Sequence, residues 1–205
     1  MTNRTITTEA TARSETTPEL ATVEANVKAE GGEATAALAQ ARDRVATIRD
    51  TVTAVSADHI QTVDLQVADA TEPFGPDIDA RYQATGRLRL KCVPETAESV
   101  VADVTDAGGT VETVQFQIHD QERQQLQDDA LTAAMERARQ KAERLAAAEQ
   151  LAVGDVQNVT TQDVDGATGM ERIVEDALDG PDADLSPTPI AVSERVEVVY
   201  ELTEE

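Results

Sequence analysis

The sequence predicts an α+β protein with a mixed, largely antiparallel sheet system and three main helices. Segments with apolar residues at every second position alternate with segments whose apolar residues recur every three or four positions. Paired glycines and a proline separate these segments. Hydrophobic residues make up 40% of the 205 residues, enough for a core. The expected element order is β-β-α-β-β-α-β-α-β-β, with hairpins and crossovers in one sheet system.

Seven segments have the composition and alternation of strands. In the clearest one, Ala21, Val23, Ala25 and Val27 alternate with polar residues, which predicts a half-buried strand that ends before Gly31-Gly32. The predicted strands are residues 5–12, 21–28, 59–67, 80–93, 110–118, 153–164 and 194–202.

Three segments have the periodicity of helices, over residues 38–55, 94–107 and 122–150. Pro94 suits a first helical turn, and Gly108-Gly109 is a typical helix stop. The first helix has one continuous apolar stripe, which consists of Leu38, Ala41, Val45, Ile48, Val52 and Val55. The helices are expected to pack on one side of the sheet.

The chain is expected to have two parts. Residues 1–17 form an N-terminal segment that is weakly ordered or an edge strand, and residues 18–203 form the α+β domain. Within this domain, residues 164–189 are acidic and rich in glycine and proline, which predicts a loop with one short helix in "MERIVEDAL".

The charge balance predicts a folded protein of a high-salt environment. There are 40 acidic and 17 basic residues, a net charge of -23. Such a charge opposes compaction, but molar salt shortens the Debye length to about 3 Å. Because the chain has many Val-rich periodic segments, disorder is disfavoured. Few lysines and a core of small residues are typical of haloarchaeal proteins. We expect diffuse cation association with the acidic surface and no nucleic-acid partner, since phosphate binding needs a basic face.

The cysteine content and the hydropathy exclude several further classes of site and of protein. A single cysteine, Cys92, excludes an internal disulfide and a Cys-based zinc cluster. The N-terminus has no apolar region of a signal peptide, and no run approaches the roughly 20 apolar residues of a membrane span. We therefore expect a cytoplasmic protein, in preference to an extracytoplasmic one, with no membrane span and no cofactor.

Several stretches in this order resemble the SIMPL domain family, a family of unknown function. They are "PELATVEANVKAEGG", "DHIQTVDLQV" with Thr62, "RYQATGRLRLKC" with Tyr82 and Ala84, the long helix with Lys141-Ala142, and "PIAVSERVEVVYEL". The likeness covers about residues 18–203. It implies a structural, envelope or stress-associated protein able to oligomerise, and no catalytic residues. The glycine usual in this family near the end of the long helix is absent at Glu149-Gln150.

The long helix carries a candidate interaction surface. Arg137, Lys141 and Arg144 recur at i, i+4 and i+7 and so share one side of the helix. They flank a predicted apolar stripe of Leu131, Ala134, Met135, Ala138, Ala142 and Leu145. One interpretation is a strip that docks an anion or a partner. The favoured one is a solvated flank whose methylene stems cover the edge of the core.

The strand "GRLRLKC" carries a second candidate surface, because alternation points Arg87, Arg89 and Lys91 outward. The same alternation points Leu88, Leu90 and Cys92 inward, so Cys92 is interpreted as a small buried hydrophobic residue. Three neighbouring bases repel one another unless acids pair with them. We therefore expect a neighbouring strand to supply acids, either Glu24 or the pair Glu197 and Glu201. An exposed anion-binding sheet face is the alternative.

Two hypotheses of function follow. The first is a non-enzymatic protein that acts by self-association, as a homo-oligomer, or by docking a protein partner. The second is a small-ligand binder or enzyme with a site near Tyr82 and His119 at a sheet end. His59 and His119, the two histidines, have no partner at metal-ligand spacing. A deep pocket with converging polar groups would favour the second hypothesis.

Overall fold

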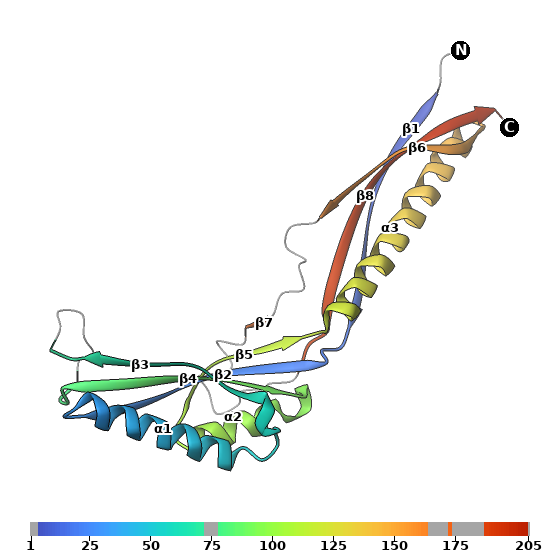
Figure 1. The fold of residues 1–205 in the computed structure, drawn as a ribbon. Coiled ribbons are helices and arrows are strands. Elements are labelled where there is room, and N and C mark those ends of the chain that lie inside the picture. The colour runs from blue at the N-terminus through green and yellow to red at the C-terminus, as the bar shows by residue number, and fades with distance from the viewer. Residues whose placement is uncertain (1–3, 72–77, 164–171, 174–186, 205) are drawn as a thin grey trace. The chain divides into compact units, whose positions relative to one another are not determined.

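The computed structural model describes residues 4–71, 78–163, 172–173 and 187–204 (Figure 1). The predicted α+β class, the three helices and the element order are confirmed, with an additional two-residue strand, β7. The described strands form two antiparallel sheets. The chain divides into two compact units, each described below by itself: unit 1 is Met1–Thr17, Ile118–Met170 and Pro189–Glu205, and unit 2 is Pro18–Gln117 and Glu171–Thr188.

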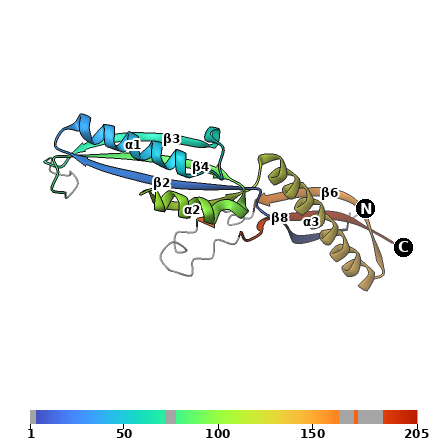
Figure 2. The same ribbon diagram turned by 90° about the horizontal axis from the view of Figure 1, so that it is seen from below.

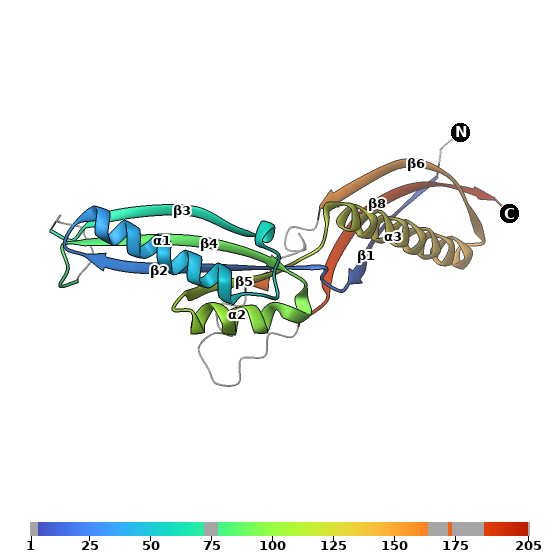
Figure 3. The same ribbon diagram turned by 60° about the horizontal axis from the view of Figure 1, so that its bottom comes forward.

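Unit 2 contains a five-stranded antiparallel sheet in the order β3-β4-β2-β5-β7. Its strands are β2 (Leu20–Gly31), β3 (Ile60–Asp69), β4 (Tyr82–Cys92), β5 (Thr110–Gln117) and β7 (Arg172–Ile173). Helices α1 (Ala34–Thr51) and α2 (Ala97–Asp106) cover one face of it, and α1 lies over β2 and β4 (Figure 3). Short 3-10 turns, η1 (Ala57–His59) and η2 (Pro94–Thr96), precede β3 and α2.

The core of unit 2 lies between this sheet face and the two helices. Alternation along β2 and β4 points small and branched side chains inward, so Val23, Val27, Leu88 and Leu90 are fully buried. The predicted stripe is confirmed on α1 at Ala41, Val45 and Ile48, whereas Leu38 is partly exposed and Ala37 is buried in its place. Val52 and Val55 are also buried but follow the helix, which ends at Thr51 and not at Val55 as predicted.

The predicted stop of α2 at the paired glycines is confirmed. Gly108 has a φ of 83°, a left-handed conformation that glycine adopts without steric cost. A Cβ on Gly109 would lie 2.8 Å from Val104 Cγ1, so a side chain there would displace the core.

Unit 1 contains a three-stranded antiparallel sheet in the order β1-β8-β6. Strands β1 (Thr5–Thr16), β8 (Ile190–Glu204) and β6 (Leu151–Asp163) come from distant parts of the chain. Helix α3 (Asp120–Ala148) packs on one face of this sheet, mainly along β1 and β8 (Figure 2). Both β1 and β6 are therefore edge strands.

The buried side of α3 is a ladder of small residues. After Leu126 at its start, these are Ala130, Ala134, Ala138, Ala142 and Ala146. The predicted stripe is correct for three of these alanines but wrong at Leu145, which is 50% exposed. A four-residue repeat advances about 40° per step around a helix of 3.6 residues per turn, so the buried side winds away from Leu145. Because the alanines are small, Thr8 Oγ1 reaches the helix backbone and donates to the Ala138 carbonyl at 2.9 Å.

Two other expectations fall partly on residues outside the described ranges. The short helix predicted in "MERIVEDAL" is wrong at Arg172–Ile173, which form β7 and pair with Gln115 and Phe116 of β5. The rest of that segment, and most of the predicted loop at 164–189, lie outside the described residues. The division into residues 1–17 and 18–203 stays a prediction.

Candidate interaction surfaces

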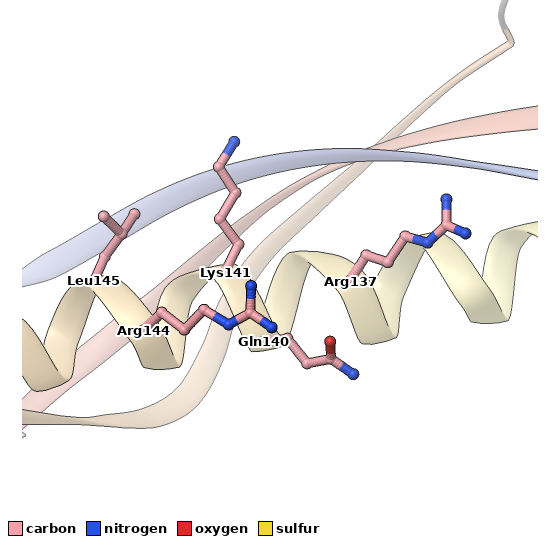
Figure 4. Close-up of a pocket in the computed structure, with 5 residues that line it drawn as sticks. All are labelled: Arg137, Gln140, Lys141, Arg144 and Leu145. Carbon is pink, nitrogen blue, oxygen red and sulfur yellow. The ribbon is translucent and has the colours of Figure 1, made fainter.

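The predicted basic side of α3 forms one continuous surface. Arg137, Lys141 and Arg144 line a shallow hollow of about 380 Å³ together with Gln140 and Leu145 (Figure 4). Figure 4 shows Lys141 and Leu145 pointing toward the blue strand, β1. The hollow thus combines three cationic heads with the apolar side chain of Leu145.

Two of these basic side chains donate hydrogen bonds to backbone carbonyls of edge strand β1. Arg137 Nη1 donates to the Thr11 carbonyl at 2.9 Å, and Lys141 Nζ donates to the Glu9 carbonyl at 3.3 Å. Edge strands present unpaired backbone groups, and charged side chains commonly protect them. This geometry supports the flank interpretation for Arg137 and Lys141. Arg144 has no hydrogen bond or ion pair within the described part of the chain, so it remains available to an anionic group.

The predicted charge pairing on β4 is confirmed by one acid. In the register of β2 and β4, Glu24 lies opposite Arg89, and Glu24 Oε1 accepts from Arg89 Nε at 3.0 Å and Nη2 at 2.7 Å. The other expected acids, Glu197 and Glu201, lie on β8 in the other sheet. Because both partners of the pair are partly exposed, we expect it to contribute about 0.2–1 kcal/mol.

The helix-free face of the unit 2 sheet also has a polar hollow of about 370 Å³. It is lined by Thr22, Glu24, Arg89, Lys91, Gln115 and Gln117. The side chains of Arg87 and Lys91 form no hydrogen bond or ion pair with any residue that the structure describes. This face can therefore offer ammonium, guanidinium and amide donors to an anionic or hydroxyl-rich group, with Arg89 already bound to Glu24.

Cys92 is buried, as expected from alternation, with 7% of its surface exposed. Burial raises the pKa of its thiol, and a hydrogen bond with Thr96 partly opposes this effect. A raised pKa lowers the fraction of thiolate, which is the nucleophilic form. Cys92 thus has the environment of a packing residue.

Tyr82 and His119, the residues of the second hypothesis, belong to different units. Tyr82 begins β4, where the Arg81 guanidinium lies 5.1 Å from the centre of its ring. His119 is the exposed residue immediately before α3. Neither residue lines the hollows described here. No group of three or more His, Cys, Asp or Glu that could hold a metal occurs among the described residues. A site near Tyr82 and His119 stays a prediction.

A contact in unit 2 that was not predicted from the sequence resembles the one between α3 and β1. Arg49 of α1 donates from Nη2 to the Ile60 carbonyl at 3.4 Å and to Thr62 Oγ1 at 3.2 Å, both on edge strand β3. A hollow of about 340 Å³ lies beside it, lined by Arg42, Val45, Ala46, Arg49, Thr62 and Leu65. The off-stripe position of Arg49 was visible in the sequence, but its partner strand depends on the sheet order.

Also missed were four exposed valines on edge strands. They are Val63 (46% exposed) and Val67 (38%) on β3, and Val156 (45%) and Val159 (42%) on β6. The broken alternation of "GDVQNVTTQD" was a signal, since the register of β6 shifts twice between Val153 and Asn158.

Helix-on-sheet packing of this element order places the protein in a class of two-sheet α+β proteins. The chain belongs to the SIMPL family, described as a protein of unknown function (DUF541), whose pattern matches residues 6–200. The resemblance inferred from the sequence motifs is thereby confirmed. No helix among the described residues is long and apolar enough to span a bilayer.

Individual solved structures resemble the chain only weakly. No curated protein matches the chain. Two solved structures from Listeria innocua align with it over 95% of this chain and 92% of theirs: an uncharacterized conserved protein at 13% identity and a hydrolase at 14% identity, each with a TM-score of 0.21. Likeness this low supports neither a shared arrangement nor a shared activity.

Proposed function

We propose that this SIMPL-family protein is non-enzymatic and acts through self-association or partner docking in a salt-rich cytoplasm. The observation that carries this proposal is the location of the exposed valines. Val63 and Val67 lie on edge strand β3, and Val156 and Val159 lie on edge strand β6. An edge strand with exposed apolar side chains is a template for pairing with another chain.

The charge of the chain supports the salt-rich setting. Copies with a net charge of -23 repel one another in dilute buffer. At molar ionic strength the Debye length falls to about 3 Å, so the repulsion between surfaces is screened while the apolar and backbone contacts remain. Association should therefore increase with salt.

The test is a measurement of molar mass by sedimentation or light scattering across a salt series from low to molar. We expect mass to increase with salt. Circular dichroism at the same salt concentrations separates association from folding, since low-salt unfolding would lower the helix signal. A folded protein that stays monomeric at every salt, in the absence of added partner, would exclude self-association.

A further inference from the structure

We infer that β6 is the strand through which two copies pair, edge to edge and antiparallel, about a two-fold axis. The inference rests on the proposed self-association and assigns it a surface. Strand β6 pairs with β8 along one edge, and no strand of the described ranges pairs with its other edge. Residues 155–161 are all exposed, and after two register shifts on either side of Val156 the pairing with β8 is regular from Asn158 onward. Both faces and one backbone edge of this stretch are thus open.

The opposite edge of the same sheet is protected. Arg137 and Lys141 extend from α3 and donate to backbone carbonyls of β1. In unit 2, Arg49 covers the start of β3 in the same way. No described side chain forms a hydrogen bond to the backbone of residues 155–161. Since charged side chains placed along an edge are one means of preventing strand pairing, their absence along the regular stretch of β6 after Asn158 distinguishes this edge from β1.

Because α3 does not fully cover β6, apolar side chains of this strand remain exposed beside its open edge. Val156 and Val159 lie opposite Tyr200 and Val198 of β8 on the α3 side of the sheet. Tyr200 and Val198 are buried, whereas the two valines are 45% and 42% exposed, because α3 packs mainly over β1 and β8. A second copy of β6 would extend the sheet and bring its own valines alongside these, which would remove apolar surface from water.

The charge pattern of β6 favours a second copy as the occupant. The stretch "VQNVTTQ", residues 156–162, is uncharged and lies between Asp155 and Asp163. In a chain of net charge -23, it is a place where two copies can approach with little repulsion. A two-fold axis near Val159 and Thr160 lays this stretch against itself and brings Asp155 of one copy toward Asp163 of the other. The interface is isologous and closes as a dimer whose formation requires salt to screen the acids.

The test compares two lysine substitutions at exposed valines. In Val159→Lys the new charge lies within the inferred interface, and in the matched control Val93→Lys it lies in unit 2 just after β4, at an exposed residue that is on no edge strand. By sedimentation at molar salt, we expect Val159→Lys to weaken association by about tenfold or more, equivalent to about 1.4 kcal/mol, and Val93→Lys to leave it unchanged. Val156→Lys serves as a second variant should Val159→Lys lose its native circular dichroism.

The outcomes distinguish failure of the inferred β6 interface from failure of the proposed self-association. If the β6 variants associate like the wild type, or if Val93→Lys weakens association as much as they do, β6 is not the pairing strand, yet self-association stands. If the wild type is monomeric at every salt, the inference fails together with the self-association on which it rests, and only partner docking is left of the proposed function.

Discussion

In both units, helix packs on an antiparallel sheet, but the side chains that fill the space between these layers differ in size. Unit 2 fills the space between its layers with branched residues such as Val27, Ile48 and Leu88. Unit 1 uses alanines along α3, and its helix lies close enough for Thr8 to bond the Ala138 carbonyl. Unit 2 therefore depends on the volume of its side chains, whereas unit 1 depends on close approach of backbones.

Truncation in unit 2 should produce the largest effect. Leu88 is fully buried in the middle of β4, so Leu88→Ala removes apolar contacts and leaves a cavity. We expect it to lower the free energy of unfolding by about 2–5 kcal/mol, measured by urea denaturation at molar salt. The matched control is Leu145→Ala on α3, which removes the same atoms from a half-exposed position and should cost less than about 0.5 kcal/mol. Equal losses in the two variants would contradict the burial assigned to them.

Enlargement in unit 1 should produce the next largest effect. Ala138 is fully buried against the sheet, and its carbonyl accepts the Thr8 hydroxyl. A leucine there would push α3 away from β1 and break this contact. We expect Ala138→Leu to lower the free energy of unfolding by about 1–3 kcal/mol in the same urea assay.

The control for this variant is Ala147→Leu, which makes the same change at an exposed position of α3. It should alter the free energy of unfolding by less than about 0.5 kcal/mol. If Ala138→Leu is as stable as Ala147→Leu, the helix of unit 1 does not approach its sheet closely, and the contrast between the units is lost.

Periodicity explains which parts of this structure were predictable. Alternation in "GRLRLKC" was sufficient to bury Leu88 and to direct Arg89 outward, because each depends only on its own strand. The contact from Arg137 to Thr11 was not predictable. It requires the order β1-β8-β6, in which the two ends of the chain pair, and no local pattern reports which strand lies at an edge. The exposure of Val159 has the same origin, since it depends on how far α3 extends over the neighbouring strands.

The two units also differ in the residue that adopts a left-handed backbone conformation after a helix. In unit 2, α2 ends at Gly108 with a φ of 83°. In unit 1, the turn between α3 and β6 places Gln150 at a φ of 57°, a left-handed conformation that favours glycine. A left-handed conformation costs a residue with a Cβ about 1–2 kcal/mol, and glycine does not incur this cost.

The smallest expected effect is therefore a stabilisation. Gln150→Gly relieves the left-handed conformation, but the unfolded chain gains about 0.5–1 kcal/mol of conformational freedom from a glycine. The net result should be an increase of up to about 1 kcal/mol in the free energy of unfolding, again by urea denaturation. The neighbouring Glu149 has a φ of -104°, so Glu149→Gly obtains no such relief and should be destabilising. Opposite signs at adjacent residues would locate the strain in the conformation of Gln150, and a loss of stability in both variants would show that the turn holds no such strain.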